Sequence, residues 1–210
     1  MESDEIWAWL LTAAAGYLLG SVSGAIIASF TRHGEDIRQY GSGNAGLTNA
    51  LRTYGVRNAV MVAGIDLGKT VLAVLLGVWL LGRPWGLIVG GGGAIFGHVA
   101  PVYYRFRGGK GILCGAAIVL MLDWRLFLLA AAVFAASVAV SKTVSVGSVL
   151  TCAVSPLLCV LLRESHAETV FVTLASALLI WMHRENLRRI DAGTEKKTVV
   201  AKRNPRRKQS

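Results

Sequence analysis

The sequence predicts an all-α integral membrane protein with seven transmembrane helices, and three observations support this fold class. Of its 210 residues, 54% are hydrophobic and only 16% are charged, and the mean hydropathy is +0.54, unlike the balance of a soluble domain. Apolar runs recur along the chain, each approaching or reaching the roughly 20 residues that a spanning helix needs. Basic residues, finally, gather between alternate runs.

The predicted spans follow the apolar runs in order. The first run is too long for a signal-peptide core and follows acids rather than bases, so we expect a retained helix. Its glycines at positions 16, 20 and 24 share one face and predict close packing against another helix. The fourth run is the weakest, unless it begins within the glycine-rich segment before it. The runs cover residues 6–30, 58–82, 85–104, 112–122, 126–141, 144–162 and 167–182.

The basic residues predict the orientation, because Lys and Arg near span ends are retained on the cytoplasmic side. With seven spans they fall on one side, except Arg83, Arg125 and Arg163 on the other and Lys69 inside a span. This places the N-terminus outside and the C-terminus in the cytoplasm. We expect residues 1–190 to form one transmembrane domain and residues 191–210 to form a basic, disordered tail that attracts anionic lipid. The tail lacks the interleaved aromatics of a nucleic-acid-binding segment.

The three cysteines, Cys114, Cys152 and Cys159, all lie in apolar runs. They show neither Cys-x-x-Cys spacing nor a histidine at metal-ligand spacing, and no cluster of carboxylates stands elsewhere in the loops. We expect packed thiols, no metal site and no cofactor.

The first polar motif is "GSGNAGLTNALR", residues 41–52. It has the outline of a nucleotide-binding P-loop, but Leu47 stands where the phosphate-binding lysine belongs, which argues against a nucleoside triphosphatase. A tight backbone with many free N–H groups still suits an anion. An ordinary Gly/Asn/Ser turn is the alternative. The candidate residues are Ser42, Asn44, Gly46, Thr48, Asn49 and Arg52.

The second motif is "GHVAPVYYRFRGGKG", residues 97–111. Gly108 and Gly109 leave the backbone unhindered beside the Lys110 ammonium, which suits an anion cradle, although a basic glycine turn between spans is also common. His98 near the end of its span is either a site residue or a satisfied core histidine.

The third motif, "WMHRENLRRI" at residues 181–190, follows the last run. His183 and Asn186 stand three apart and face the same way on a helix. Asp66 and Lys69 have the same spacing inside the second run, where a charged pair is either functional or a fixed ion pair.

Together the motifs supply cationic and amide groups that suit one or two phosphates at the cytoplasmic edge of an apolar bundle. Such a site could join a lipid-soluble partner to a water-soluble phosphorylated one. A membrane transporter or exchanger of organic phosphates would share these basic loops, but the chain shows no internal repeat. A non-catalytic scaffold that binds anionic lipid through the tail is the third alternative.

These motifs resemble those of the bacterial acyl-phosphate-dependent glycerol-3-phosphate acyltransferases, polytopic enzymes of phospholipid synthesis. The resemblance runs from "YLLGSVSGAI" at residues 17–26 to "HRENLRRIDAGTE" at residues 183–195. "GSGNAGLTNALR", "GHVAPVYYRFRGGKG" and "HRENL" look like the family's three motifs in the right order. The departures are modest: Leu47, Thr70 and Ala100, of which Leu47 could reshape the donor pocket.

The resemblance implies roles for the motif residues. It implies that glycerol-3-phosphate and the catalytic pocket are lined by Ser42, Arg52, Lys110, His183 and Asn186. It implies that the phosphate of the acyl donor is held by Asn44, Thr48, Asn49 and the loop amides. Further candidate substrate-binding residues are Gly46, Gly108, Gly109 and His98. It further implies a multi-pass protein of the bacterial inner membrane whose partners are its two substrates and membrane lipid, with no obligate protein partner.

The implied reaction is attack of the glycerol-3-phosphate 1-hydroxyl on the acyl carbonyl of an acyl phosphate, giving lysophosphatidate and inorganic phosphate. Because phosphate is a good leaving group and no cysteine stands in a motif, we expect direct, metal-independent transfer by proximity and electrostatic stabilisation. The proton could pass to His183 or to the donor phosphate. Acylation of Ser42 is the less favoured alternative.

Overall fold

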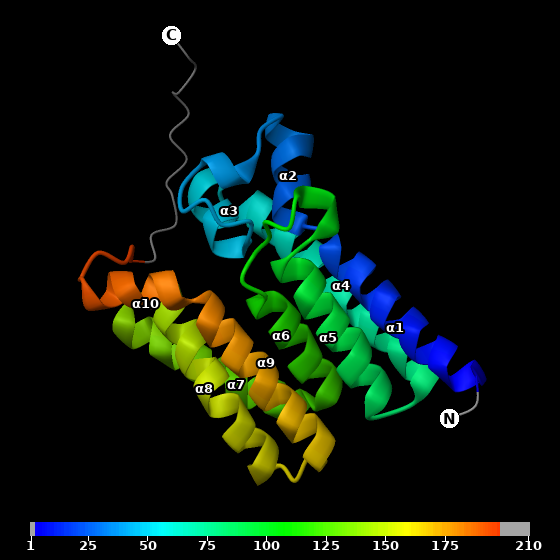
Figure 1. The fold of residues 1–210 in the computed structure, drawn as a ribbon. Coiled ribbons are helices and arrows are strands. Elements are labelled where there is room, and N and C mark those ends of the chain that lie inside the picture. Colours follow the sequence, from blue (N-terminus) through cyan, green and yellow to red (C-terminus); the bar gives the residue numbers. More distant parts are fainter. Residues whose placement is uncertain (1–2, 198–210) are drawn as a thin grey trace.

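The fold is all-helical, as predicted (Figure 1). The computed structural model describes residues 3–197, and this part of the chain forms ten α-helices and two short 3-10 helices without a strand. The α-helices are α1 (Ser3–Ser21), α2 (Gly24–His33), α3 (Leu47–Tyr54), α4 (Val56–Leu81), α5 (Trp85–Val99), α6 (Ile112–Leu122), α7 (Trp124–Ser141), α8 (Val144–Leu161), α9 (His166–Met182) and α10 (Arg184–Asp191). The 3-10 helices are η1 (Ile37–Gln39) and η2 (Val102–Tyr104).

Every predicted apolar run corresponds to a helical stretch. Among the described residues, five stretches are long and apolar enough to cross a membrane. Helices α6 and α9 are apolar but shorter, so the count of seven crossings stays a prediction. The five are Glu5–His33, Val56–Leu81, Trp85–Tyr104, Trp124–Ser141 and Val144–Leu161.

The first apolar run is interrupted between α1 and α2. Ser23 caps α2, and its side chain accepts a hydrogen bond from the amide of Ile26. The amide of Gly24 donates instead to the Asp66 side chain on α4, at 3.1 Å. A buried carboxylate therefore holds one of the backbone groups that the break would otherwise leave without a partner.

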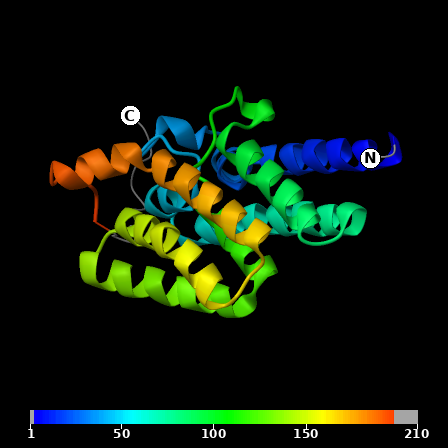
Figure 2. The ribbon, with the colours of Figure 1, turned by 60° about the horizontal axis from the view of Figure 1, so that its bottom comes forward.

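The helices form two packed groups joined by α6 (Figures 1 and 2). One group contains α1, α4 and α5, which pack against one another, and the other contains α7, α8 and α9. Helix α6 contacts α4 and α5 on one side and α7 and α9 on the other. An apolar core follows this junction, from Val74 on α4 through Ile118 on α6 to Val172 on α9.

The close packing predicted for the three glycines is confirmed, but Gly24 begins α2 beyond the break and does not share the α1 face of Gly16 and Gly20. A Cβ atom added at Gly16 would lie 2.8 Å from the carbonyl oxygen of Gly90, and one at Gly20 would collide with the backbone of Ala94. At Gly24 it would lie 2.9 Å from the carbonyl oxygen of Val62. The backbones approach too closely for any larger residue.

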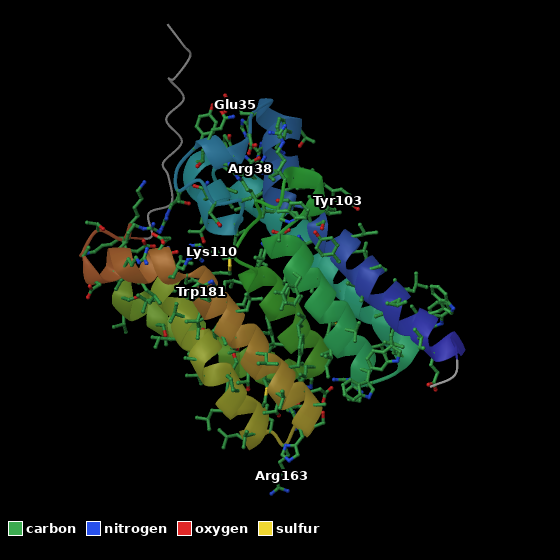
Figure 3. The ribbon with its side chains drawn as sticks, viewed as in Figure 1. Glu35, Arg38, Tyr103, Lys110, Arg163 and Trp181 are labelled. Carbon is green, nitrogen blue, oxygen red and sulfur yellow. The ribbon has the colours of Figure 1, made fainter. Side chains whose placement is uncertain are left out.

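The motif loops lie together, as Figure 3 shows. Lys110 stands between the segment that carries Arg38 and the helix that carries Trp181, whereas Arg163 lies at the far end of the α8–α9 hairpin. Residues 191–197, which the sequence analysis assigned to the tail, fold back toward this region because the Glu195 carboxylate is held by three side chains. These contacts connect residues beyond the predicted boundary to the site, and the boundary at residue 190 stays a prediction. Residues 198–210 of the predicted tail lie outside the described residues.

Candidate active site

A cavity of about 620 Å³ lies between the two helix groups. All predicted site residues line it except Gly108 and Gly109. Its polar end is formed by the first motif, Lys110, the end of α9 and α10. Its apolar part runs between α6, α7, α8 and α9 and is lined by Ile112, Ile118, Phe127, Phe134, Phe171 and Val172, among others.

The first motif is a compact loop organised around Asn49. The Asn49 amide nitrogen donates to the carbonyl oxygens of Tyr40 and Asn44, at 3.0 Å each, and of Ile37, at 3.3 Å. Its side-chain oxygen accepts from the backbone amide of Ser42, at 3.0 Å. Asn49 lines the cavity, but its side-chain amide already forms hydrogen bonds within the loop. Its role is therefore to shape the site rather than to bind a ligand.

The same loop presents the start of α3 to the cavity. Gly46 is the N-cap and provides no capping side chain, and Gly46, Leu47 and Thr48 all line the cavity. The first N–H groups of a helix have no intrahelical partner, so this end is suited to an anion. Arg52 lies one turn further along α3, and one of its guanidinium nitrogens donates to the carbonyl oxygen of Lys196, at 2.9 Å.

The glycines of the second motif have a different role from the one the sequence suggested. The amides of Gly108 and Gly109 donate to the carbonyl oxygens of Val99 and His98, at 3.2 and 3.1 Å, instead of facing the cavity. Added Cβ atoms would collide with the His98 carbonyl oxygen and imidazole ring. The two glycines let the chain pass close to the end of α5, and this path brings Lys110 to the cavity.

Lys110 and Asn186 meet at the polar end of the cavity. The Lys110 ammonium donates to the side-chain oxygen of Asn186, which is buried at the start of α10. The Asn186 amide nitrogen donates to Ser145 Oγ, at 2.8 Å, and to Glu195 Oε1, at 2.6 Å. The second and third motifs are thus joined by a fixed amide.

Three further residues that line the cavity were not predicted from the sequence: Ser145, Arg189 and Glu195. Glu195 accepts from Ser145 Oγ at 2.6 Å and forms an ion pair with Arg189 at 2.7 Å. Glu195 was expected in the tail, Ser145 was one hydroxyl in an apolar run, and Arg189 was not singled out from its motif. The spacing of Asn186, Arg189 and Glu195 around one helical end was the only available signal.

His183 lies where α9 passes into α10 and is 4% exposed. Its Nδ1 lies 2.8 Å from the carbonyl oxygen of Leu179. A carbonyl can only accept, so Nδ1 carries a proton. Burial lowers the pKa of His183, and this effect, with that of the nearby Lys110, outweighs the hydrogen bond to Leu179 and the charge of Glu195, which raise it. The neutral ring is therefore favoured. Neutral His183 therefore has an unprotonated Nε2 that can accept a proton.

The site has a cationic excess. Four cationic residues line the cavity with two carboxylates, those of Asp66 and Glu195, and Asp66 is already paired with Lys69; the four cations are Arg52, Lys110, Arg189 and Lys196. Burial lowers the pKa of Lys110 to about 8, and the neighbouring Arg189 and Arg52 act in the same direction, while Glu195 opposes them. Burial by itself would raise the pKa of Glu195, but hydrogen bonds from Ser145, Arg189 and Asn186 outweigh it, and the pKa is lowered. An anionic ligand would relieve the crowding of positive charge.

The predicted Asp66–Lys69 pair is present as a buried ion pair with an N–O distance of 2.9 Å. Lys69 Nζ also lies 2.9 Å from Nδ1 of His98, and Asp66 and His98 both line the cavity. The three cysteines are free and buried. Between residues 3 and 197, no three His, Cys, Asp or Glu side chains come together as a metal site would require.

The family model described as "Glycerol-3-phosphate acyltransferase" matches residues 10–193 of this chain. The chain belongs to the glycerol-3-phosphate acyltransferase family. Curated relatives include the glycerol-3-phosphate acyltransferase of Thermoanaerobacter sp. (strain X514), 38% identical over 90% of this chain and 94% of the relative. Another, from Halalkalibacterium halodurans, is 40% identical over 90% of this chain and 94% of its own length.

Two solved structures have the same fold. They are crystal structures of PlsY (YgiH), an integral membrane glycerol 3-phosphate acyltransferase, in a glycerol 3-phosphate form and a lysophosphatidic acid form. Their TM-scores are 0.85 and 0.83 at 30% and 28% identity, and each match covers 91% of this chain and 96% of the other. This protein is accordingly a membrane-integral, multi-pass acyltransferase of lipid biosynthesis.

Proposed function

We propose that the chain transfers a fatty acyl group from an acyl phosphate to the 1-hydroxyl of glycerol-3-phosphate, directly and without a metal ion. The observation that carries the proposal is one cavity whose cationic end opens into an apolar channel. A phosphorylated alcohol suits the cationic end, and an acyl chain suits the channel. The solved relatives in glycerol 3-phosphate and lysophosphatidic acid forms support this pairing of substrate and product.

The two phosphates have different proposed places. Arg52 and Lys110, with Asn186 beside them, bind the phosphate of glycerol-3-phosphate, because their charges meet at the polar end. The uncapped start of α3, with Asn44 and Thr48, holds the phosphate of the acyl donor, while Ser42 lines the glycerol-3-phosphate and catalytic pocket. Asn49 shapes this loop, and the amides of Gly108 and Gly109 are withdrawn from ligand binding by their bonds to α5.

Transfer then follows in one displacement. The 1-hydroxyl oxygen bonds to the acyl carbon through a tetrahedral oxyanion, and the bond from that carbon to the phosphate oxygen breaks with its electron pair on phosphate. The hydroxyl proton passes to Nε2 of His183 or to the departing phosphate, and Ser42 is not acylated. The protein contributes mostly orientation of the two substrates and compensation of their charge.

We also propose that the chain crosses the bacterial inner membrane seven times, with its N-terminus outside and the site on the cytoplasmic face. The distribution of basic residues supports this orientation. Helices α6 and α9 are then the short crossings. A membrane can accommodate a short span by local thinning or by tilt of neighbouring helices.

The test is lysophosphatidate formation by detergent-purified protein given glycerol-3-phosphate and palmitoyl phosphate in excess chelator. Wild type should turn over, whereas Arg52→Ala should lose about tenfold or more of kcat/KM, the effect of one hydrogen bond between charged groups. Arg57→Ala is the matched control, since Arg57 is exposed near the same loop and does not line the cavity.

His183→Ala should also lose activity, with His166→Ala as its control at the far, exposed start of α9. Turnover with an acyl thioester but not with acyl phosphate would contradict the proposal that acyl phosphate is the donor. Loss of activity with chelator, restored by a divalent ion, would overturn metal independence. Uptake of labelled glycerol-3-phosphate into liposomes without acyl donor would instead favour the organic-phosphate transporter.

A further inference from the structure

A buried charged cluster lies beside the cavity at the junction of α4, α5 and the α1–α2 break. Its members are Asp66, Lys69 and His98, which are 1%, 5% and 5% exposed. Asp66 Oδ1 accepts from Lys69 and from the amide of Gly24. The cluster lies within predicted spans, where unpaired charge is costly, and the reaction described above makes no use of its ion pair.

The contacts of Lys69 determine which nitrogen of His98 carries the proton. An ammonium has three donors and no acceptor. Lys69 donates to the carbonyl oxygen of Val22, at 2.5 Å, and to Asp66 Oδ1, at 2.9 Å. Its remaining close neighbour is Nδ1 of His98, at 2.9 Å. That nitrogen must accept, so the proton of the neutral ring is on Nε2.

Direct pairing of His98 with Asp66 does not compete with this assignment. Nδ1 of His98 lies 3.7 Å from Asp66 Oδ1, which is beyond hydrogen-bonding distance, and it is closer to the ammonium. If the His98 ring were a charged imidazolium, Nδ1 would carry a proton that points at a proton of the Lys69 ammonium, and the two donors would repel each other. The network therefore holds the ring neutral, in the tautomer with hydrogen on Nε2.

Nε2 of His98 lies where the first two motifs meet. A Cβ atom added at Gly109 would collide with Nε2 and would lie 2.6 Å from the carbonyl oxygen of Ala45 in the first motif. His98 lines the cavity together with Asn44 and Gly46 of that loop. Within residues 3–197, no hydrogen bond from Nε2 to protein is formed, so its N–H is available to a ligand.

His183 has the opposite tautomer. Its Nδ1 donates to the carbonyl oxygen of Leu179, which leaves Nε2 as an acceptor. The cavity is thus lined by one histidine with a donor at Nε2 and one with an acceptor at Nε2.

We propose that Lys69 is a positioning residue that holds His98 as an N–H donor to the phosphate of the acyl donor, while His183 remains free to accept the hydroxyl proton. The proposal rests on the proposed function and assigns a task to the ion pair. Asp66 compensates and orients Lys69, and Lys69 determines the tautomer of His98. The donated hydrogen bond strengthens as negative charge collects on the departing phosphate, which favours transfer.

The first experiment reads the tautomers without activity. Nitrogen NMR of histidine-labelled protein in detergent distinguishes protonated from unprotonated ring nitrogens, and His98→Gln and His183→Gln assign the signals. We expect His98 to show a protonated Nε2 and an unprotonated Nδ1, and His183 to show the reverse. A protonated Nδ1 on His98 would overturn the proposal, whatever the donor of the reaction proves to be.

The second experiment removes the ion pair as a unit, because a lone buried charge would threaten folding. In Asp66→Asn/Lys69→Met we expect the KM for palmitoyl phosphate to rise about tenfold, the size of one hydrogen bond to a charged group, with the KM for glycerol-3-phosphate within about twofold. The matched control is Arg83→Met/Glu168→Gln, which removes an ion pair of 2.8 Å that does not line the cavity. Unchanged KM values in the first double variant, or equal changes in both, would overturn the proposal.

Amide replacements of His98 separate positioning from packing. The amide nitrogen of glutamine reaches the place of Nε2, whereas that of asparagine reaches only the place of Nδ1. His98→Gln should therefore retain the low KM for palmitoyl phosphate better than His98→Asn, and loss of the ion pair should have little further effect in the His98→Gln background. Equal losses in the two single variants would contradict the role of Nε2. Absence of wild-type turnover with palmitoyl phosphate would instead contradict the proposed donor, leaving the NMR result as the test of the tautomer.

Discussion

Replacing Glu195 by glutamine tests whether the end of the described chain belongs to the catalytic machinery. Glu195 Oε1 accepts from Ser145 and Asn186, and Oε2 accepts from Arg189. A glutamine has only one accepting oxygen, so one side of this arrangement must face an NH₂ group. Since Arg189 is 41% exposed at its side chain, we expect the glutamine to turn its NH₂ toward Arg189 and keep the buried contacts.

The size of the effect follows from what this arrangement loses. The ion pair with half-exposed Arg189 contributes about 1 kcal/mol or less, and the buried contacts lose their charge assistance, so we expect a total loss of about 1–2 kcal/mol. If this free energy is lost from stabilisation of the transition state, kcat/KM decreases by about 5–30-fold. Glu195 also raises the pKa of Lys110, so the variant should lose the Lys110 charge at lower pH than wild type.

The assay is lysophosphatidate formation at limiting glycerol-3-phosphate across a pH series, with thermal unfolding in detergent to confirm folding. Glu185→Gln on the neighbouring helix α10 is the matched control, because the ion pair of Glu185 with Arg188 is largely exposed and contributes little. Wild-type kcat/KM and pH profile in Glu195→Gln would refute the reasoning. So would an equal loss in Glu185→Gln, because the effect would then be one of general surface charge.

Two further predictions concern Lys110 and the glycine face of α1. Because burial lowers the pKa of Lys110 from 10.5 to about 8, its charge and kcat/KM for glycerol-3-phosphate should fall above that pH, while the unfolded chain still binds the proton and folding stability rises. Lys110→Arg should shift this alkaline decrease in kcat/KM to higher pH. If the decrease stays at the same pH, a group other than Lys110 is responsible for it. Gly20→Val should cost about 1–3 kcal/mol of stability by separating α1 from α5, whereas Gly64→Val, with open space around it, should not; equal melting temperatures in detergent would contradict the packing.

The helices and the polar motifs could be predicted from the sequence because each depends on local composition. Lipid requires long apolar segments with internally paired backbones, so the runs stand out along the chain. The polar motif residues stand out for the opposite reason, because polar groups next to such apolar runs are costly and usually have a function. They include Arg52, Lys110, His183 and Asn186. The pairing of Asp66 with Lys69 also follows from their spacing on one helix.

The roles of Asn49 and Gly109 could not be predicted, because a motif does not show where its hydrogen bonds go. Both looked like ligand-binding groups. In the fold, Asn49 closes its own loop and the Gly109 amide bonds to the end of α5. Internal hydrogen bonds therefore determine the shape of the Gly-rich loop at residues 41–52. Only the polar groups of this loop that take no part in those bonds remain available to a ligand.

By itself the sequence determined an all-helical membrane protein with three cationic motifs and, through their resemblance, its family. Only the tertiary structure decided that Glu195 lines the cavity, that this cavity lies between the two groups of helices, and that Nδ1 of His98 meets Lys69 while Nδ1 of His183 meets the Leu179 carbonyl. The physical reason is the distance along the chain between interacting residues. Apolar runs and helical periodicity involve residues close in sequence, whereas a hydrogen bond from Lys69 to His98 or from Asn186 to Glu195 forms only after packing has brought its two partners into contact.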